Sequence, residues 1–297
     1  MRIFLTGATG FIGSRIVPEL LEAGHQVLGM TRSDEGAQKL QAAGAEVHRG
    51  DLEDLDSMRK GATGVDAVIH CAFDHDFSNF VANTEKDRRV ITAMADALVG
   101  SDRALVITSG VGIGAKTPGQ PATEDYFDKD HPNPRKASEE AGHAALDRGV
   151  NVSVVRLPQV HDTEKQGLIT PLIAMARKAG LIGYVGEGQN RYAAAAVLDV
   201  AKLYRLVVER AERGSVWNAV AEEGVPVRDI AEVLGAGLKI PVKSLSEEET
   251  RQVFGWMSAF AAMDISASSA YTQKTLNWKP TGPGLLEDLR KMDYFNI

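Results

Sequence analysis

Three glycines near the N-terminus constrain this chain more than any other feature. They are Gly7, Gly10 and Gly13 in TGATGFIG, directly after the apolar run at residues 3–5. A backbone that turns sharply after a strand and then approaches an anion more closely than a Cβ atom permits requires glycine. The amphipathic segment FIGSRIVPELLEAG follows, so we expect a helix from about Phe11 whose free N–H groups face the turn. This strand, turn and helix predict a site for the pyrophosphate of a dinucleotide, the alternative being a simple tight turn.

Length, charge and cysteine content narrow the range of functions. The 297 residues have a formal net charge of −7, and no block of Lys or Arg is present, which disfavours nucleic acids and membranes as partners. Cys71 is the single cysteine, so no intrachain disulfide can form. No apolar run approaches the roughly 18 residues of a membrane span, and no motif has the spacing of metal ligands. We expect a cytoplasmic protein that acts on a small molecule without a metal.

Short β-rich runs alternate with helical patterns through the first half of the chain. The runs are IFLT, QVLGMT, AEVHRG, DAVIHCA, ALVITSG and NVSVVRLP, and apolar residues recur at helical spacing in 34–43, 83–99 and 136–148. This alternation predicts an α/β fold with a Rossmann-type, doubly wound parallel sheet and right-handed helical crossovers. We place this nucleotide-binding domain at residues 1–160.

The pattern changes after about residue 160. Helical stretches such as LITPLIAMARKAG, DVAKLYRLVVERAE and VRDIAEVLGAGL dominate, with one short strand-like segment, SVWNAV. We expect residues 161–297 to form mainly a smaller, mostly helical C-terminal substrate domain, while parts of 190–220 return to the first domain. The small-residue run AAAAVLDVA after Arg191 and Tyr192 either approaches the substrate or packs in a helical core.

The end of the second strand favours one cofactor, because ligands of a doubly wound sheet lie beyond the carboxyl ends of its strands. That strand ends at Thr31, Arg32 and Ser33, where a protein that binds NAD is expected to carry an acidic residue. Arg32 can bond a 2′-phosphate, with Ser33 as a second donor, which favours NADP over NAD. The alternative is an exposed arginine at a loop start, since Asp34 and Glu35 follow immediately.

Further cofactor contacts are expected at the ends of the next strands. Asp51 can accept a bond from the adenine amino group, cap the following helix, or do both. Small residues after the fourth strand would let the dinucleotide lie across the sheet, whereas His70 fits a buried strand histidine. The full set of predicted cofactor-binding residues is Gly7, Thr9, Gly10, Phe11, Ile12, Gly13, Arg32, Ser33, Asp51, Leu52, Ala72, Phe73, Pro158 and Val160.

These segments together resemble the short-chain dehydrogenase/reductase superfamily, of the extended or atypical type that includes NAD(P)-dependent epimerases and dehydratases. The resemblance rests on TGATGFIG, GDLED, VIHCA, VITSG, VVRLPQV and NWKPT, and it covers nearly the whole chain. It implies a Rossmann domain that binds NAD(P), a small substrate domain and a catalytic Ser/Thr, Tyr and Lys, with the last two spaced Y-x-x-x-K. In such a set the tyrosine exchanges a proton with the substrate oxygen, the lysine lowers the tyrosine's pKa, and the serine orients the carbonyl.

The catalytic set implied by the resemblance is incomplete in this chain. Lys136 lies near the start of the expected helix, but Pro132 occupies the position four residues earlier, where the tyrosine belongs. The remaining candidates are Ser109, Tyr126 and Lys136. Each has a plain alternative, because Thr108 competes with Ser109, Tyr126 fits an exposed loop and Lys136 fits a solvated first helical turn.

Three further features have open roles. Asp87 falls where many relatives carry an asparagine, and we interpret it as a surface aspartate. His161, after the sixth strand, is the histidine with a candidate role in the cleft. An apolar cluster near the C-terminus either lines a pocket for an apolar or aromatic substrate or packs in a core or a dimer interface. It consists of Phe254, Trp256, Met257 and Phe260.

The predicted function is that of an NADP-dependent oxidoreductase, which reduces a carbonyl or oxidises an alcohol of a small organic substrate. Ser109 would polarise the oxygen, and Tyr126, Lys136 or water would complete the proton transfer. The missing tyrosine motivates an alternative, a dinucleotide-binding sensor without turnover. Nucleotide-sugar epimerisation or dehydration ranks third, because no clear basic patch for a second pyrophosphate is present. The resemblance also suggests a homodimer.

Overall fold

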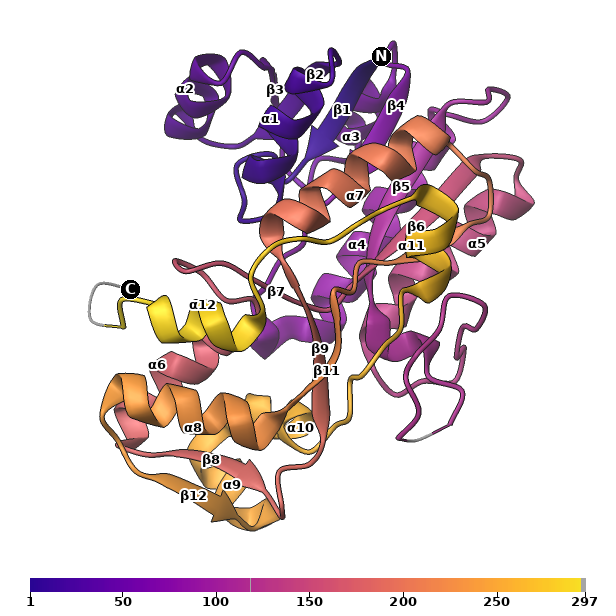
Figure 1. Cartoon of the computed structure of the whole chain (residues 1–297). Coiled ribbons are helices and arrows are strands. Elements are labelled where there is room, and N and C mark those ends of the chain that lie inside the picture. Colours follow the sequence, from indigo (N-terminus) through magenta and orange to yellow (C-terminus); the bar gives the residue numbers. More distant parts are fainter. Residues whose placement is uncertain (118, 295–297) are drawn as a thin grey trace.

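The computed structural model describes residues 1–117 and 119–294 (Figure 1). Within these residues, seven parallel strands form the main sheet in the order β3-β2-β1-β4-β5-β6-β10. The strands are β1 (Arg2–Thr6), β2 (Gln26–Thr31), β3 (Glu46–Arg49), β4 (Ala67–His70), β5 (Ala104–Gly110), β6 (Asn151–Leu157) and β10 (Val216–Asn218). The predicted Rossmann-type α/β fold is confirmed.

Helices cover both faces of the main sheet, because successive side chains of each strand point to opposite sides. On β1, Ile3 and Leu5 pack into the core on one face, whereas Phe4 packs into the core on the other. The first face carries α1 (Gly13–Glu22), α2 (Asp34–Ala42) and α7 (Val197–Arg210), and the second carries α3 (Leu55–Ala62), α4 (Phe80–Asp96) and α5 (Ala137–Asp147). Because the seven strands are parallel, their carboxyl ends all lie at one edge of the sheet, where a ligand can bind.

The segment from α7 to β10 lies with the first half of the chain in space. Helix α7 packs against α1, and β10 pairs with β6 at the edge of the main sheet. Figure 1 shows α7 crossing the face of the sheet beside strands that precede it by far in the sequence. Residues 197–218 therefore pack with the main sheet and its helices.

The C-terminal part contains strands as well as the predicted helices. A three-stranded sheet has the order β11-β9-β7, and a two-stranded sheet pairs β12 with β8. The strands are β7 (Gln159–His161), β8 (Ile182–Val185), β9 (Arg191–Ala196), β11 (Glu222–Pro226) and β12 (Val242–Leu245). The helices are α6 (Ile169–Ala179), α8 (Val227–Leu238), α9 (Glu247–Phe254), α10 (Ser258–Ala261), α11 (Ala270–Leu276) and α12 (Leu285–Lys291).

The alanine run at residues 193–196 is strand β9, so a helical core is the wrong interpretation of that run. Alanine has the highest helix propensity, and nothing local in the run indicates a strand. The run is extended because β7 and β11 pair with it on either side. Tertiary pairing therefore overrides local propensity here.

A buried ion pair fixes α5 to β6 close to the carboxyl edge of the sheet. Arg156 donates through Nε and Nη2 to the two carboxylate oxygens of Glu139, at 2.9 and 2.7 Å. Its Nη1 donates to the carbonyl oxygen of Thr123 at 3.0 Å. A buried guanidinium is tolerated when its charge and donors are matched in this way. The pair therefore also holds the long loop between β5 and α5 against the sheet.

None of the helices in residues 1–117 and 119–294 combines the length and the apolar character needed to cross a bilayer. The same residues do not gather three His, Cys, Asp or Glu side chains into an arrangement that could hold a metal ion.

Candidate active site

The glycine turn between β1 and α1 brings backbone segments into close approach. Gly7 has a φ of +70°, and a Cβ atom there would lie 2.8 Å from the backbone nitrogen of Ala72. A Cβ atom at Gly13 would lie 2.0 Å from the carbonyl oxygen of Gly7. Both positions therefore require glycine. Helix α1 begins at Gly13 and not at Phe11, so Phe11 and Ile12 belong to the turn.

The N-terminus of α1 has the properties of an anion site. Its N-cap residue, Ile12, makes no side-chain hydrogen bond, and the first turn contains no acidic residue. Among the described residues, no group accepts a hydrogen bond from the N–H of Phe11 or Ile12. Thr9 and Gly10 are exposed on the same turn. Free N–H groups and the positive end of the helix dipole favour a phosphate, so the turn fits the pyrophosphate of a dinucleotide.

Two residues predicted for the adenosine end of the cofactor lie together after β2 and β3. Arg32 Nη1 is 3.6 Å from Asp51 Oδ2, and the Arg32 side chain is 77% exposed. The Ser33 hydroxyl caps α2 by accepting from the N–H of Gly36 at 3.0 Å. Asp51 accepts from the N–H of Glu53 at 2.9 Å, but Asp54 caps α3 by accepting from the N–H of Ser57, so the expected capping role of Asp51 is wrong and its adenine contact stays a prediction. The guanidinium of Arg32 is accessible to a phosphate.

The other predicted cofactor residues have mixed environments. Leu52 is half-buried against the core on the α3 to α5 side of the sheet. Ala72 and Phe73 follow β4 and are half-buried, as is Pro158 between β6 and β7. Val160 lies on β7, and its buried side chain belongs to the core. Its carbonyl oxygen accepts from the N–H of Gly167 at 2.9 Å, and the residue pairs with Ala195 of β9.

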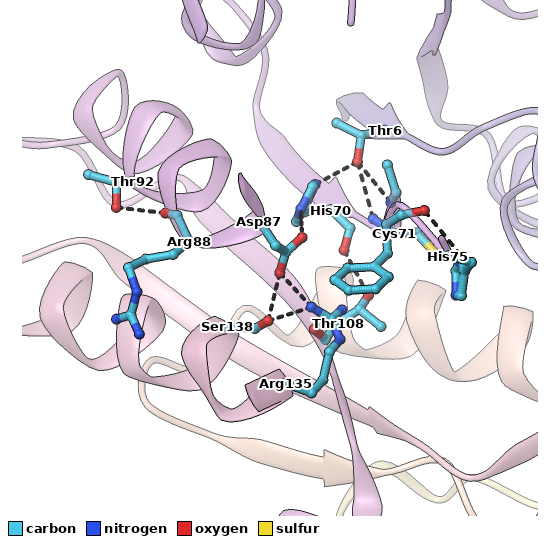
Figure 2. A network of polar contacts seen from close by, with 12 residues as sticks. Thr6, His70, Cys71, His75, Asp87, Arg88, Thr92, Thr108, Arg135 and Ser138 are labelled. Atoms are coloured by element: carbon cyan, nitrogen blue, oxygen red, sulfur yellow. Dashed lines mark hydrogen bonds and ion pairs between the residues drawn. The ribbon is translucent and has the colours of Figure 1, made fainter. Parts of the chain in front are cut away.

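A buried network of polar side chains joins the ends of β1 and β4 to α4 (Figure 2). Thr6 Oγ1 lies 2.7 Å from His70 Nδ1, and His70 Nε2 lies 2.9 Å from Asp87 Oδ1. Thr6 Oγ1 also accepts from the N–H groups of Cys71 and Ala72, each at 3.2 Å. Because a carboxylate can only accept, His70 donates through Nε2 to Asp87.

Asp87 is 2% exposed, so its interpretation as a surface aspartate is wrong. Its Oδ2 accepts from Arg135 Nη1 and from Ser138 Oγ, each at 2.6 Å. Burial alone would raise the pKa of this carboxyl group. The charge of Arg135 and the hydrogen bonds from His70 and Ser138 outweigh burial and hold the pKa of Asp87 well below its ordinary value. Asp87 is therefore an anion inside the protein.

Arg135 is the cation of this network, and sequence reasoning missed it. It lies in the 3₁₀ turn Pro134–Lys136, which leads into α5. Its Nη2 donates to the carbonyl oxygen of Thr108 at 3.0 Å, and its guanidinium carbon lies 4.0 Å from the centre of the Phe73 ring. The bond to Thr108, near the end of β5, places the guanidinium at the carboxyl edge of the sheet, and the side chain is 13% exposed. The expected cation, Lys136, is its neighbour in the chain.

No hydrogen bond or ion pair joins any two of the three predicted catalytic residues, Ser109, Tyr126 and Lys136, within the described residues. Lys136 Nζ donates to the carbonyl oxygen of Lys129 at 2.6 Å. Tyr126 lies in the loop between β5 and α5, with Lys116 Nζ 5.9 Å from its ring centre.

The two competing hydroxyls at the end of β5 point to opposite faces of the sheet. Thr108 Oγ1 donates to the carbonyl oxygen of His70 at 2.7 Å and bonds the hydroxyl of Tyr204, on α7, at 2.6 Å. Ser109 is 3% exposed, and its Oγ has no partner among the described residues. The Thr108 hydroxyl is therefore already engaged, whereas that of Ser109 is free but enclosed.

The remaining candidates connect the C-terminal part to the first domain. His161 is buried on β7, and its Nδ1 lies 2.7 Å from Asp288 Oδ2 on α12. Phe254 belongs to the core of the C-terminal part. Trp256 stacks on Phe77, which follows β4, with ring centres 4.2 Å apart and an interplanar angle of 10°. The apolar cluster thus packs partly in a core and partly against a loop at the edge of the main sheet.

Replacing Asp87 with asparagine tests the buried anion, because Arg135 would lose its charged partner. We expect Asp87→Asn to lower the free energy of unfolding by about 3 kcal/mol at neutral pH. A carboxyl group whose pKa is lower in the folded state stabilises the fold above its unfolded-state pKa, and this contribution is lost as the pH falls through the folded-state pKa. The difference between wild type and variant should therefore shrink below about pH 4. Urea unfolding of both proteins at a series of pH values measures this difference in the free energy of unfolding.

The matched control for this measurement is Glu85→Gln on the same helix. Glu85 pairs with Arg88 at the surface, with Glu85 50% exposed, so we expect a change below about 0.5 kcal/mol. A difference between wild type and Asp87→Asn that stays constant from neutral to strongly acidic pH would contradict the assignment of Asp87 as the stabilising anion.

Comparisons with known proteins agree with this geometry. Residues 3–219 match the model of the NAD dependent epimerase/dehydratase family. The chain is 43% identical over 296 residues to an uncharacterized protein of Schizosaccharomyces pombe, covering 99% of this chain and 100% of the relative. It is 29% identical over 259 residues to a 2-alkyl-3-oxoalkanoate reductase of Stenotrophomonas maltophilia, covering 81% of this chain and 77% of the relative.

Solved structures share the fold. The UDP-glucose 4-epimerase of Thermus thermophilus, crystallised with NAD, superimposes with a TM-score of 0.76 at 19% identity, and the match covers 100% of this chain and 99% of the epimerase. The predicted family is therefore confirmed. The chain belongs to the NAD(P)-dependent epimerase/dehydratase family, the extended type of the short-chain dehydrogenase/reductase superfamily.

Proposed function

We propose that the protein is an NADP-dependent oxidoreductase that reduces a carbonyl group, or oxidises the corresponding alcohol, of a small organic substrate. The observation that carries the choice of cofactor is the exposed guanidinium of Arg32 at the end of β2. The glycine turn fits the pyrophosphate of NAD and of NADP alike. A guanidinium favours NADP over NAD, because it forms charge-assisted bonds with the 2′-phosphate of NADP that the ribose hydroxyl of NAD cannot match.

Two observations support carbonyl chemistry. A relative over most of the chain is named a 2-alkyl-3-oxoalkanoate reductase. Arg135 also provides a fixed positive charge at the carboxyl edge of β4 and β5, where a substrate oxygen that gains negative charge would be stabilised. When bound, the reduced cofactor supplies a hydride. The chain's own residues hold the dinucleotide at the α1 terminus and keep Arg135 in place through Asp87 and Ser138.

The choice between the two cofactors is tested by Arg32→Ala. We expect NADPH to bind about 10- to 150-fold more weakly, since a charge-assisted bond contributes about 1.5–3 kcal/mol, while the dissociation constant for NADH changes little. Calorimetric titration of NADPH and NADH into wild type and into Arg32→Ala gives the four dissociation constants. Arg49→Ala is the matched control, because Arg49 is an exposed arginine that ends the neighbouring strand β3 and pairs with Asp34. Equal weakening of both nucleotides in Arg32→Ala would assign Arg32 a role unrelated to the 2′-phosphate.

The reaction itself is tested with purified protein, NADPH and a panel of ketones, β-keto esters and aldehydes. We expect NADPH absorbance to fall with at least one member, and the corresponding alcohol to be found by mass spectrometry. The panel is compared with a reaction that lacks protein. If NADPH absorbance falls with no member of the panel, in a preparation that binds NADPH, the proposal is overturned and the dinucleotide-binding sensor is favoured.

A further inference from the structure

The loop that leaves β4 presents a histidine with a free ring nitrogen at the carboxyl edge of the sheet. His75 Nδ1 lies 3.1 Å from the carbonyl oxygen of Phe73. Because a carbonyl oxygen can only accept, Nδ1 carries the proton, and the neutral ring has its lone pair on Nε2. No described residue bonds Nε2, and the residue is exposed. In Figure 2, His75 lies apart from the buried network of Thr6, His70 and Asp87.

Hydrogen bonds hold the loop around His75 in place. Asp74 accepts from Lys86 Nζ, on α4, at 2.9 Å. Asp76 accepts from the N–H of Ser78 at 3.0 Å, and its carbonyl oxygen accepts from Asn83 Nδ2 at 2.9 Å. The neighbours of His75 on both sides are therefore anchored to α4 or to the turn before it. The loop that carries the imidazole is therefore held in a defined conformation by hydrogen bonds.

Rings and charges from four elements surround this imidazole. The rings of Phe73 and Phe77 meet it edge-on, with centres 5.2 and 6.0 Å away. The charges that act on its pKa are those of Arg135 from the turn before α5, Lys165 from the loop after β7, and Asp74 beside it in the loop. Although His75 has solvent-accessible surface, the surrounding chain removes part of the ring from water. This desolvation, and then the positive charge of Arg135, lower the pKa of His75 and outweigh the bond to the backbone of Phe73.

The Phe73 ring connects His75 with Arg135, because the imidazole centre lies 5.2 Å and the guanidinium carbon 4.0 Å from its centre. Lys165 Nζ lies 5.8 Å from the centre of the Phe11 ring, which belongs to the glycine turn. The charge of Lys165, like that of Arg135, acts on His75. A carbonyl compound that enters this edge of the sheet beside a dinucleotide held at α1 would therefore meet a cation and an imidazole.

His131 is the rival histidine, because it stands four residues before Arg135. It lies outside the 3₁₀ turn that begins at Pro134, and its Nδ1 accepts from the N–H of Asn133 at 3.1 Å. The charged groups near it are Asp128 and Lys136, not Arg135. His131 therefore belongs to the polar loop between β5 and α5, away from the buried network.

We infer that His75 exchanges the proton with the substrate oxygen, in place of the tyrosine that this chain lacks, while Arg135 stabilises the charge on that oxygen. The inference rests on the proposed function. In reduction, the carbonyl carbon gains the hydride from the reduced cofactor, and the electron pair of the C=O π bond moves to oxygen. That oxygen takes the proton from Nε2 of the protonated imidazole, and a proton from the bulk solvent restores the imidazolium, so each turnover consumes one solvent proton. The products are the alcohol and the oxidised cofactor; alcohol oxidation runs the same steps in reverse.

The first test follows the imidazole directly and needs no substrate. Histidine ring nitrogens are observed by NMR in uniformly labelled protein, with the signals of residue 75 assigned through His75→Gln. We expect a neutral ring protonated at Nδ1, a pKa below the ordinary histidine value, and a clear shift of the ring signals on saturation with NADP. His143, exposed on α5, should not respond. A ring protonated at Nε2, or one that NADP leaves unchanged, would overturn the inference.

The second test uses a substrate from the panel of carbonyl compounds. We expect His75→Gln to lower kcat for reduction by about 100-fold or more while the NADPH dissociation constant stays within about twofold; His143→Gln should match wild type in both. Reduction requires the protonated ring, so wild-type activity should fall as the pH rises through the pKa of His75, and alcohol oxidation should show the opposite dependence. His75→Gln should lose this dependence.

The outcomes separate the two proposals. Full activity and an unchanged pH profile in His75→Gln would refute the role of His75 and leave the oxidoreductase function standing. Absence of turnover in wild type, with NADPH bound, would refute the oxidoreductase function. The inference about proton transfer would then fall with it, whatever the NMR titration gave.

Discussion

The close approach of the backbone at Gly7 and Gly13 is the constraint on which the rest of the site depends. With no side chain at either position, the carbonyl of Gly7 lies against the first residue of α1, and the end of β4 packs against the same turn. The uncapped N–H groups of α1 then face the edge at which the parallel strands end. A dinucleotide held there extends across the carboxyl ends of the strands. The positions of Arg32, His75 and Arg135 acquire a function only relative to that anchor.

A second constraint acts inside the protein, at Asp87. An isolated carboxylate in the core would be strongly unfavourable, but three donors converge on this one. The consequence is mechanical as well as electrostatic. Arg135 is tied on one side to Asp87 and on another to the backbone of β5, so its remaining surface is presented in a fixed direction beside Phe73. A lysine in its place could not make both connections with one planar group.

The features that sequence could predict are those encoded locally. Strand and helix alternation and the glycine turn depend on periodicity and on residue types within a few positions, and they predict the fold and a dinucleotide cofactor; the arginine after β2 supports the proposal of NADP. Strand β9 depends instead on pairing with β7, which precedes it in the sequence, and with β11, which follows it. The burial of Asp87 depends on His70 and Arg135, which lie 17 and 48 residues away. A charged residue with no local sign of partners resembles a surface residue, which explains why the network was missed.

The most direct measurement is a calorimetric titration of NADPH into the purified protein and into Gly13→Ala, with circular dichroism to establish that both are folded. The added methyl group would collide with the carbonyl oxygen of Gly7 and displace the turn from the helix terminus. Saturable binding by wild type, weakened at least tenfold in the variant, is the expected result. A folded wild-type protein without affinity for any pyridine nucleotide, or a folded variant that binds as tightly as wild type, would contradict the assignment of this turn as the dinucleotide site.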